Sequence, residues 1–137
     1  MKLKINIVDA FTDTIFKGNQ AAVIILTSWL EDSLMQNIAM ENNLSETAFL
    51  LKNEDDTYHI RWFSPFTEID FCGHATLASA FILFKNNSHL GSLNFYAQAV
   101  GNFEILKKEN NFIQMNFPNR KPKKLDVIPK ELIEGLS

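Results

Sequence analysis

The chain is short of cysteine and has no long apolar run. Its 137 residues include one cysteine, Cys72, so no intramolecular disulfide can form, which excludes the disulfide framework of small secreted domains. The longest apolar run, 75–84, is about half of the roughly 20 residues that a helix needs to cross a bilayer. The N-terminus shows no basic stretch followed by an apolar run, unlike a signal peptide. We therefore expect a cytoplasmic protein with no membrane partner.

Positive charge and glycine are also scarce. The net charge is −3, so there is no overall basic field of the kind that nucleic-acid binding uses, and we expect no nucleic-acid partner. With only 5 glycines but 12 phenylalanines and 46% apolar residues, the chain can bury a core, which excludes a collagen-like or disordered chain. The length is typical of one domain.

The hydrophobic pattern predicts an α+β fold with two helices inside the main domain. An outer helix is expected at about 29–42, with Thr27 and Ser28 as its capping residues and an apolar face at i, i+4 spacing. A second helix, at about 74–85, is apolar nearly all round, which indicates a central helix buried in protein. Strands are expected at 3–8, 21–26, 44–51, 58–63, 68–71, 92–97, 100–107 and 112–117.

The C-terminal end has a different composition. Three of the four prolines lie between 118 and 129, together with a Lys/Arg cluster at 120–124, which is typical of a solvated linker. Pro129 is then expected in the first turn of a helix, and the sequence stops at Ser137 before it supplies a segment for this helix to pack against. We expect a domain at 1–117, followed at 118–137 by a linker and the start of a second domain that is missing from this chain.

Glu46 is a candidate acid/base residue. It is the one charged side chain of 43–49, at the change from helix to strand, where we expect it to be partly desolvated. Desolvation favours the protonated form of a carboxyl group, which suits a group that must both take and give a proton. The alternative is a glutamate on an edge strand that points into water.

A second candidate site lies where Cys72, Gly73 and His74 precede the buried helix. A helix N-terminus suits a carboxylate or enolate, Gly73 allows close approach to the backbone, and His74 can donate a hydrogen bond or carry a proton. The alternative is a plain turn with a helix-capping histidine and a small buried cysteine. No metal site is expected, because the histidines lie on different elements and Cys72-x-His74 is not a usual zinc spacing.

Two further patterns are less specific. Asn19, after Gly18, offers both a donor and an acceptor to a ligand, although a plain turn is the commoner use of this pair. The sequence contains neither a Walker loop nor a G-x-G-x-x-G motif, so nothing in it supports a nucleotide cofactor.

Taken together, five ordered blocks resemble the phenazine-biosynthesis PhzF-like isomerase family. The blocks are V-D-A-F-T at 8–12, G-N-Q-A-A-V at 18–23, N-L-S-E-T-A-F at 43–49, I-R-W-F-S-P at 60–65 and E-I-D-F-C-G-H-A-T-L-A at 68–78. The resemblance implies the diaminopimelate epimerase-like fold, in which each of two halves wraps a mixed sheet or barrel around a central helix. The resemblance covers nearly the whole of this chain, but the chain corresponds only to the first of the family's two halves.

The resemblance also implies roles for single residues. Glu46 corresponds to the acid/base that moves a proton between carbons of a small carboxylated substrate, without a metal or an organic cofactor. Gly73 and His74 correspond to substrate contacts, and Ser45 to a residue that helps to hold a substrate carboxylate. Asn19 completes the expected substrate-binding set. Cys72 matches in position a catalytic cysteine of related epimerases, but we expect it to be a bystander here.

The chain departs from the family in two respects. The second half, with its own acid and serine, has no counterpart, and Gln20 stands where the family often has proline, which changes the stiffness of the loop. The leading hypothesis is therefore the N-terminal half of a PhzF-like isomerase or epimerase in a biosynthetic pathway. The alternative is a truncated, inactive remnant that acts as a binding or association module. In either case we expect self-association, as a homodimer, because half of a two-half fold leaves an apolar face uncovered.

Overall fold

The computed structural model describes residues 2–119, 121–124 and 127–136. Parts of the expected linker, Arg120 among them, lie outside the described residues, as does Ser137. The elements along the chain are β1 (Ile5–Ala10), β2 (Asn19–Leu26), α1 (Asp32–Asn42), β3 (Glu46–Lys52), β4 (Tyr58–Phe63), β5 (Glu68–Ile69), α2 (Gly73–Asn86), β6 (Ser92–Ala97), β7 (Gly101–Lys107), a 3-10 turn (Glu109–Asn111), β8 (Ile113–Met115) and α3 (Lys130–Gly135).

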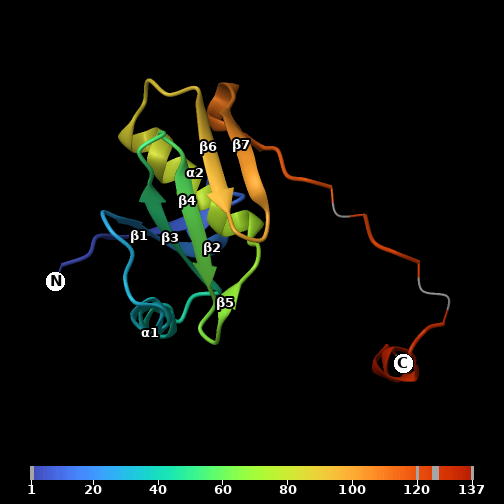
Figure 1. The fold of residues 1–137 in the computed structure, drawn as a ribbon. Coiled ribbons are helices and arrows are strands. Elements are labelled where there is room, and N and C mark those ends of the chain that lie inside the picture. The colour runs from blue at the N-terminus through green and yellow to red at the C-terminus, as the bar shows by residue number, and fades with distance from the viewer. Residues whose placement is uncertain (1, 120, 125–126, 137) are drawn as a thin grey trace.

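The strands form one mixed, curved sheet in the order β1-β2-β3-β4-β6-β7-β8, with β5 paired to β4 (Figure 1). The pairs β2–β3 and β4–β6 are parallel, and the other pairs are antiparallel. A parallel pair needs a crossover connection, and α1 and α2 occur in the two crossovers that the topology demands. The α+β class expected from the sequence is confirmed.

Helix α2 packs against the sheet and forms the largest core with it. Eight of its residues are buried, and it contacts β1, β2, β3 and β8. The helix interior includes two buried hydroxyls, Thr76 and Ser79, which donate to the carbonyl oxygens of Cys72 and Ala75 one turn earlier. No hydroxyl of this pair is left unsatisfied in the core, so the burial costs little. Phe81, which is 43% exposed, marks the part of α2 that the sheet leaves uncovered.

Helix α1 begins later than the sequence predicted, so the expected start at 29 is wrong. The helix starts at Asp32, and the residue before it caps the helix without a side-chain hydrogen bond. Trp29 and Leu30 instead pack onto a second core cluster, and the Trp29 ring meets the His59 ring edge-on at 5.0 Å between centroids. Tertiary packing of these two apolar side chains outweighs the capping preference of Thr27 and Ser28.

Arg61, on β4, links α1 to the sheet through ion pairs with Asp32 and Glu68. Its guanidinium donates to both carboxylate oxygens of Glu68 at 2.6 Å and to Asp32 at 2.8 Å. The bidentate hydrogen bonds to Glu68 raise the pKa of Arg61. The hydrogen bond that Arg61 donates to Asp32 lowers the pKa of Asp32. The helix ends at Asn42, and the left-handed conformation of its C-cap Asn43 (φ 51°) turns the chain directly into the segment that begins β3.

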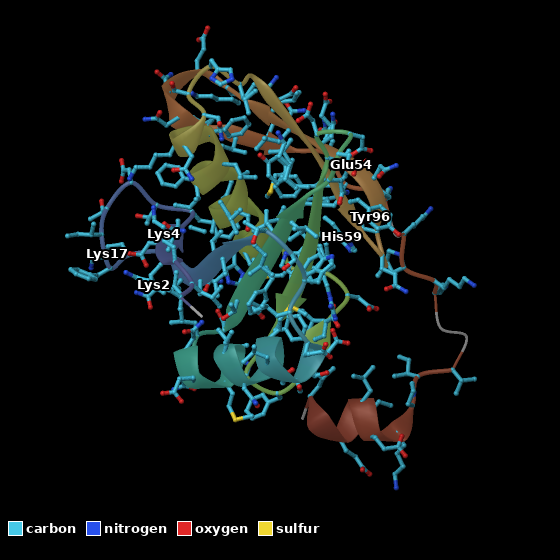
Figure 2. The ribbon with its side chains drawn as sticks, turned by 60° about the vertical axis from the view of Figure 1, so that its left-hand side comes forward. Lys2, Lys4, Lys17, Glu54, His59 and Tyr96 are labelled. Carbon is cyan, nitrogen blue, oxygen red and sulfur yellow. The ribbon has the colours of Figure 1, made fainter. Side chains whose placement is uncertain are left out.

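Lysines flank the β1 edge of the sheet. Figure 2 shows Lys2, Lys4 and Lys17 on this side of the molecule, and β1 has a partner strand on one side only. Charged side chains beside an edge strand oppose pairing with another chain. Within the described residues, no helix is both long and apolar enough to span a membrane.

Every strand boundary lies within two residues of the boundary expected from the sequence. The expected strand at 112–117 shortens to β8, whereas β2 begins two residues before the expected 21. Residues 116–119, which follow β8, lead away from the sheet (Figure 1), and every described residue from 127 to 136 is exposed. The sequence placed Pro129 in the first turn of the C-terminal helix, whereas α3 begins at Lys130 and Pro129 lies one residue earlier, at the N-cap.

Candidate functional site

The candidate site forms where β2, β3 and α2 begin. Strands β2 and β3 run parallel, with Ala21 opposite Glu46, so the first two residues of β2 lie beside the residue just before β3. Asn19 and Gln20 thereby meet Ser45, and the first turn of α2 brings His74 to the same place. Three segments that are distant in sequence supply one cluster.

Ser45 connects these segments. Its hydroxyl oxygen lies 3.2 Å from the Gln20 carbonyl oxygen, 3.5 Å from Asn19 Oδ1 and 3.3 Å from His74 Nε2. The hydroxyl has one proton to donate, and the Gln20 carbonyl is the nearest acceptor. Its lone pairs then remain available to a donor on the imidazole side.

His74 lies between three groups. Its Nε2 is 3.1 Å from Glu46 Oε2, and its Nδ1 is 3.3 Å from Cys72 Sγ. Every nitrogen has a partner if Nδ1 accepts from the Cys72 thiol and Nε2 donates to the Ser45 oxygen. This assignment gives a continuous chain of contacts, Cys72–His74–Ser45–Gln20, with Glu46 beside it.

The Glu46 carboxylate is mostly buried and incompletely hydrogen-bonded. Its side chain is 18% exposed, and Oε2 is fully buried without a hydrogen-bond partner. The 3.1 Å approach of His74 Nε2 is close enough for an ion pair, but its direction does not make a hydrogen bond. An unsatisfied buried carboxylate oxygen is costly, so it needs a functional or structural reason. The sequence-based expectation that Glu46 is partly desolvated agrees with this burial.

Cys72 closes the buried end of the cluster. It is 7% exposed, and burial raises the pKa of its thiol to about 11, assisted by the negative charge of Glu46. The backbone N–H groups of Ala75 and His74 act in the opposite direction. The thiol is therefore neutral near pH 7 and available as a hydrogen-bond donor.

Two glycines shape the site in different ways. A Cβ atom added at Gly18 would lie 2.5 Å from the Ala10 carbonyl oxygen, so no other residue fits there without a backbone shift. A Cβ atom added at Gly73 would meet nothing within 4 Å, because the start of α2 faces open space. The open space at Gly73 leaves room for a ligand at the helix N-terminus.

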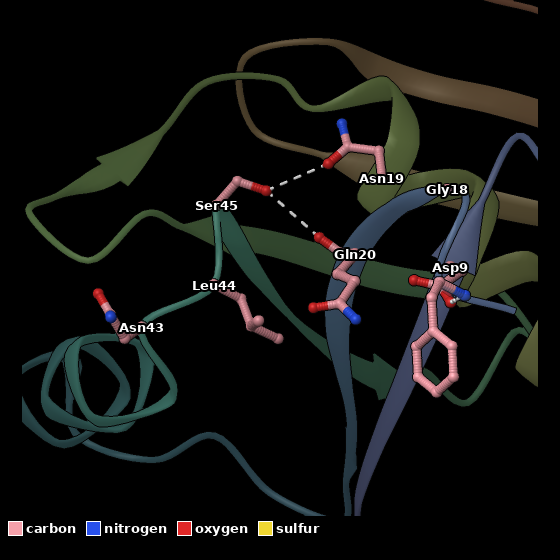
Figure 3. Close-up of a pocket in the computed structure, with 8 residues that line it drawn as sticks. Asp9, Gly18, Asn19, Gln20, Asn43, Leu44 and Ser45 are labelled. Carbon is pink, nitrogen blue, oxygen red and sulfur yellow. Dashed lines mark hydrogen bonds between the residues drawn. The ribbon is translucent and has the colours of Figure 1, made fainter.

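A cavity of about 410 Å³ adjoins the cluster (Figure 3). It shares Ser45 and Asn19 with the cluster, and Figure 3 shows the Ser45 hydroxyl directed at Asn19 and Gln20. The other lining residues are Asp9, Phe16, Gly18, Gln20, Asn43 and Leu44. Among the described residues no arginine or lysine lines this cavity, so its described wall offers acceptors and amides rather than positive charge.

Five residues were expected from the sequence, and the fold places them at one location: Asn19, Ser45, Glu46, Gly73 and His74. Sequence reasoning did not identify Asp9, whose Oδ2 accepts from the backbone N–H of Phe16 and whose Oδ1 is buried without a partner. The signal for it was its place in the first block at 8–12. Cys72, expected to be a bystander, contacts His74 directly.

Comparison with known proteins identifies the family. A family model described as "Phenazine biosynthesis-like protein" matches residues 8–137. An uncharacterized isomerase of Halalkalibacterium halodurans is 46% identical over 99% of this chain and 51% of its own length. An uncharacterized isomerase of Pseudomonas aeruginosa is 43% identical over 99% of this chain and 51% of its own length. The chain thus spans about half the length of the curated relatives it matches.

Solved structures agree with this result. A PhzF-family protein of Enterococcus faecalis superposes with a TM-score of 0.82 at 46% identity, covering 97% of this chain and 50% of that one. A predicted epimerase of Pseudomonas aeruginosa, with a TM-score of 0.70 at 24% identity, covers 83% of this chain and 42% of that one and shows the likeness of the fold alone. By sequence and by fold, this chain belongs to the PhzC-PhzF family of phenazine biosynthesis-like proteins.

Proposed function

We propose that this chain is the N-terminal half of an isomerase or epimerase that transfers a proton at carbon on a small carboxylated substrate. The observation that carries the proposal is the contact of Glu46 with His74 at 3.1 Å in a mostly buried cluster beside an open helix start. Relatives named as isomerases support this function over that of an inactive association module. The reaction belongs in the cytoplasm and needs neither a metal nor an organic cofactor.

Glu46 performs the proton transfer in this proposal. Its carboxylate takes a proton from a carbon next to an electron-withdrawing group, and the electron pair of the broken C–H bond moves onto that group. The new Glu46 O–H bond then breaks as the proton returns to another carbon, so the enzyme is regenerated and no redox partner is needed. The incomplete hydrogen bonding of Oε2 supports this role, because an oxygen without a partner is free to form an O–H bond.

The neighbours of Glu46 hold the reacting groups. A substrate carboxylate or enolate binds at the start of α2, where the helix dipole favours negative charge and Gly73 leaves room for it. As that charge develops, His74 and Ser45 exchange their hydrogen bonds with Ser45 and with the Gln20 carbonyl for bonds to the substrate, which stabilises the transition state more than the ground state. Asn19 orients the part of the substrate that enters the adjoining cavity. The second half that two-half relatives contain closes the cleft and excludes water.

The test is a chimera in which residues 1–117 of this chain replace the matching half of the Enterococcus faecalis protein. The chimera is incubated in D₂O with a panel of small unsaturated carboxylates, and deuterium entering carbon positions is followed by NMR. We expect Glu46→Gln to slow deuterium exchange by about 10²–10⁴-fold. Glu54→Gln, at an exposed turn residue, is the matched control and leaves the rate unchanged. Full exchange in the Glu46→Gln chimera would falsify the proposal.

A further inference from the structure

The cluster around His74 contains three side chains of the types that bind zinc. One ligand atom each from Glu46, Cys72 and His74 lies within 4.8 Å of the other two. Carboxylate oxygen, thiolate sulfur and imidazole nitrogen are the usual zinc ligands in proteins. The sequence spacing Cys72-x-His74 argues against a metal because it supplies only two donors at an unusual interval. The fold adds the third donor from the start of β3.

The geometry is close to that of a metal site. Tetrahedral zinc, with bonds of about 2.0–2.3 Å, places its ligand atoms roughly 3.3–3.8 Å apart. The Cys72 sulfur is already 3.3 Å from His74 Nδ1, and the widest separation in the cluster exceeds the tetrahedral value by about 1.5 Å at most. Side-chain rotation is needed to close this gap, and the open space at Gly73 leaves room for a water or a ligand near the cluster.

The cluster also has unused bonding capacity. Oε2 of Glu46 is buried without a hydrogen-bond partner, although His74 lies beside it. Glu46 lies at Nε2 of His74 and Cys72 lies at Nδ1, so a single cation binds one of these nitrogens and the side chain at the other nitrogen turns to reach it. A bound cation would satisfy this oxygen and organise both side chains.

We propose that Glu46, Cys72 and His74 form a binding site for a divalent cation of the zinc class, and that the cation inhibits the protein. Binding forms a metal–sulfur bond and releases the thiol proton to solvent. The cation also occupies the carboxylate that takes the substrate proton. The binding site stands independently, whereas the inhibition rests on the proposed function.

Cobalt is the probe, because Co²⁺ occupies zinc sites and reports its ligands by absorption. Co²⁺ is titrated into the reduced, tag-free 137-residue chain. We expect a near-ultraviolet thiolate-to-metal charge-transfer band and the intense visible bands of tetrahedral Co²⁺, saturating at one metal per chain. Added Zn²⁺ abolishes both, because zinc binds such sites more tightly than cobalt.

Three variants assign the ligands, and one serves as a control. Cys72→Ser removes the charge-transfer band, and Glu46→Gln and His74→Ala each weaken Co²⁺ binding at least about tenfold. His89→Ala, at an exposed loop position, leaves the spectrum unchanged. Far-ultraviolet circular dichroism establishes that each variant folds. If Cys72→Ser does not fold, Cys72→Ala is used in its place.

The spectrum also separates the two proposals. A folded wild-type chain without a charge-transfer band overturns the metal site and leaves the isomerase function untouched. A band that survives Cys72→Ser, or one that disappears with His89→Ala, overturns the assignment of ligands. Failure of the Glu46→Gln exchange test removes the inhibitory consequence but not the metal spectrum, because no substrate is present in the titration.

Discussion

The reactivity of Cys72 provides a direct test of the buried cluster, because it is the only cysteine in the chain. Burial raises its pKa from the usual 9.0 to about 11. Only the thiolate attacks a disulfide, so near pH 8 the folded chain has about a hundredfold less reactive form than the unfolded chain. A thiolate of higher pKa is intrinsically more nucleophilic, which recovers about tenfold of this loss. The net expectation is a reaction about tenfold slower in the folded chain, before any steric protection.

The assay measures the rate of reaction with an aromatic disulfide as a function of pH, with a chelator present. In the folded chain the rate rises with pH toward a midpoint near 11, whereas in guanidinium the midpoint falls near 9. The midpoint lies higher in the folded chain because the folded environment disfavours the Cys72 thiolate, so a higher pH is needed to deprotonate the thiol. Far-ultraviolet circular dichroism at each pH establishes that the chain remains folded.

Glu46→Gln separates the two causes of the Cys72 shift. Desolvation is the larger cause, and the charge of Glu46 adds to it. The variant is therefore expected to lower the midpoint without returning it to 9. A midpoint at or below 9 in the folded wild-type chain, or no change in the variant, would refute the placement of the thiol beside the carboxylate.

Two further predictions concern the core and the surface. Phe49→Ala removes a fully buried ring that meets Phe63 edge-on at 5.5 Å, and in urea unfolding it should lower the free energy of unfolding by about 3–5 kcal/mol. The control Phe66→Ala, at a 91% exposed ring, should change it by less than about 0.5 kcal/mol, and equal losses would contradict the core assignment. The chain should also self-associate in light-scattering measurements as its concentration rises, because large apolar side chains such as Phe16 and Phe66 are exposed; a strict monomer would contradict this.

The elements that the sequence predicted best are those whose pattern is strong and local. The apolar run at 75–84 became the buried part of α2, and the ends of that helix differ from the expected 74–85 by one residue each. The hairpin of β3 and β4 has the polar turn at 53–56 that separates two strand-like runs. In both cases the local preference and the tertiary packing agree, so the pattern is sufficient.

The remaining features depend on contacts between distant segments. Nothing near Trp29 in the sequence indicates that its ring packs on His59. With Trp29 in this contact, α1 begins at Asp32 rather than at the expected residue 29. The contact of Glu46 with His74 likewise depends on the packing of β3 against α2, which are far apart in the sequence, and the parallel pairing of β2 with β3 adds Gln20 to the same place. Such register cannot be read from composition or from the period of a single segment.

The replacement of proline by Gln20 acts on the cavity rather than on the cluster. Ser45 donates to the backbone carbonyl of Gln20, an acceptor that proline also possesses, so this contact does not depend on the side chain. The Gln20 side chain instead lines the cavity, and Gln20 pairs across the sheet with Asp9, so both side chains lie on the same face. An amide beside a carboxylate adds hydrogen-bonding groups where proline would offer an apolar ring. The substitution therefore preserves the position of Ser45 next to His74 while changing which ligand groups the cavity wall can bind.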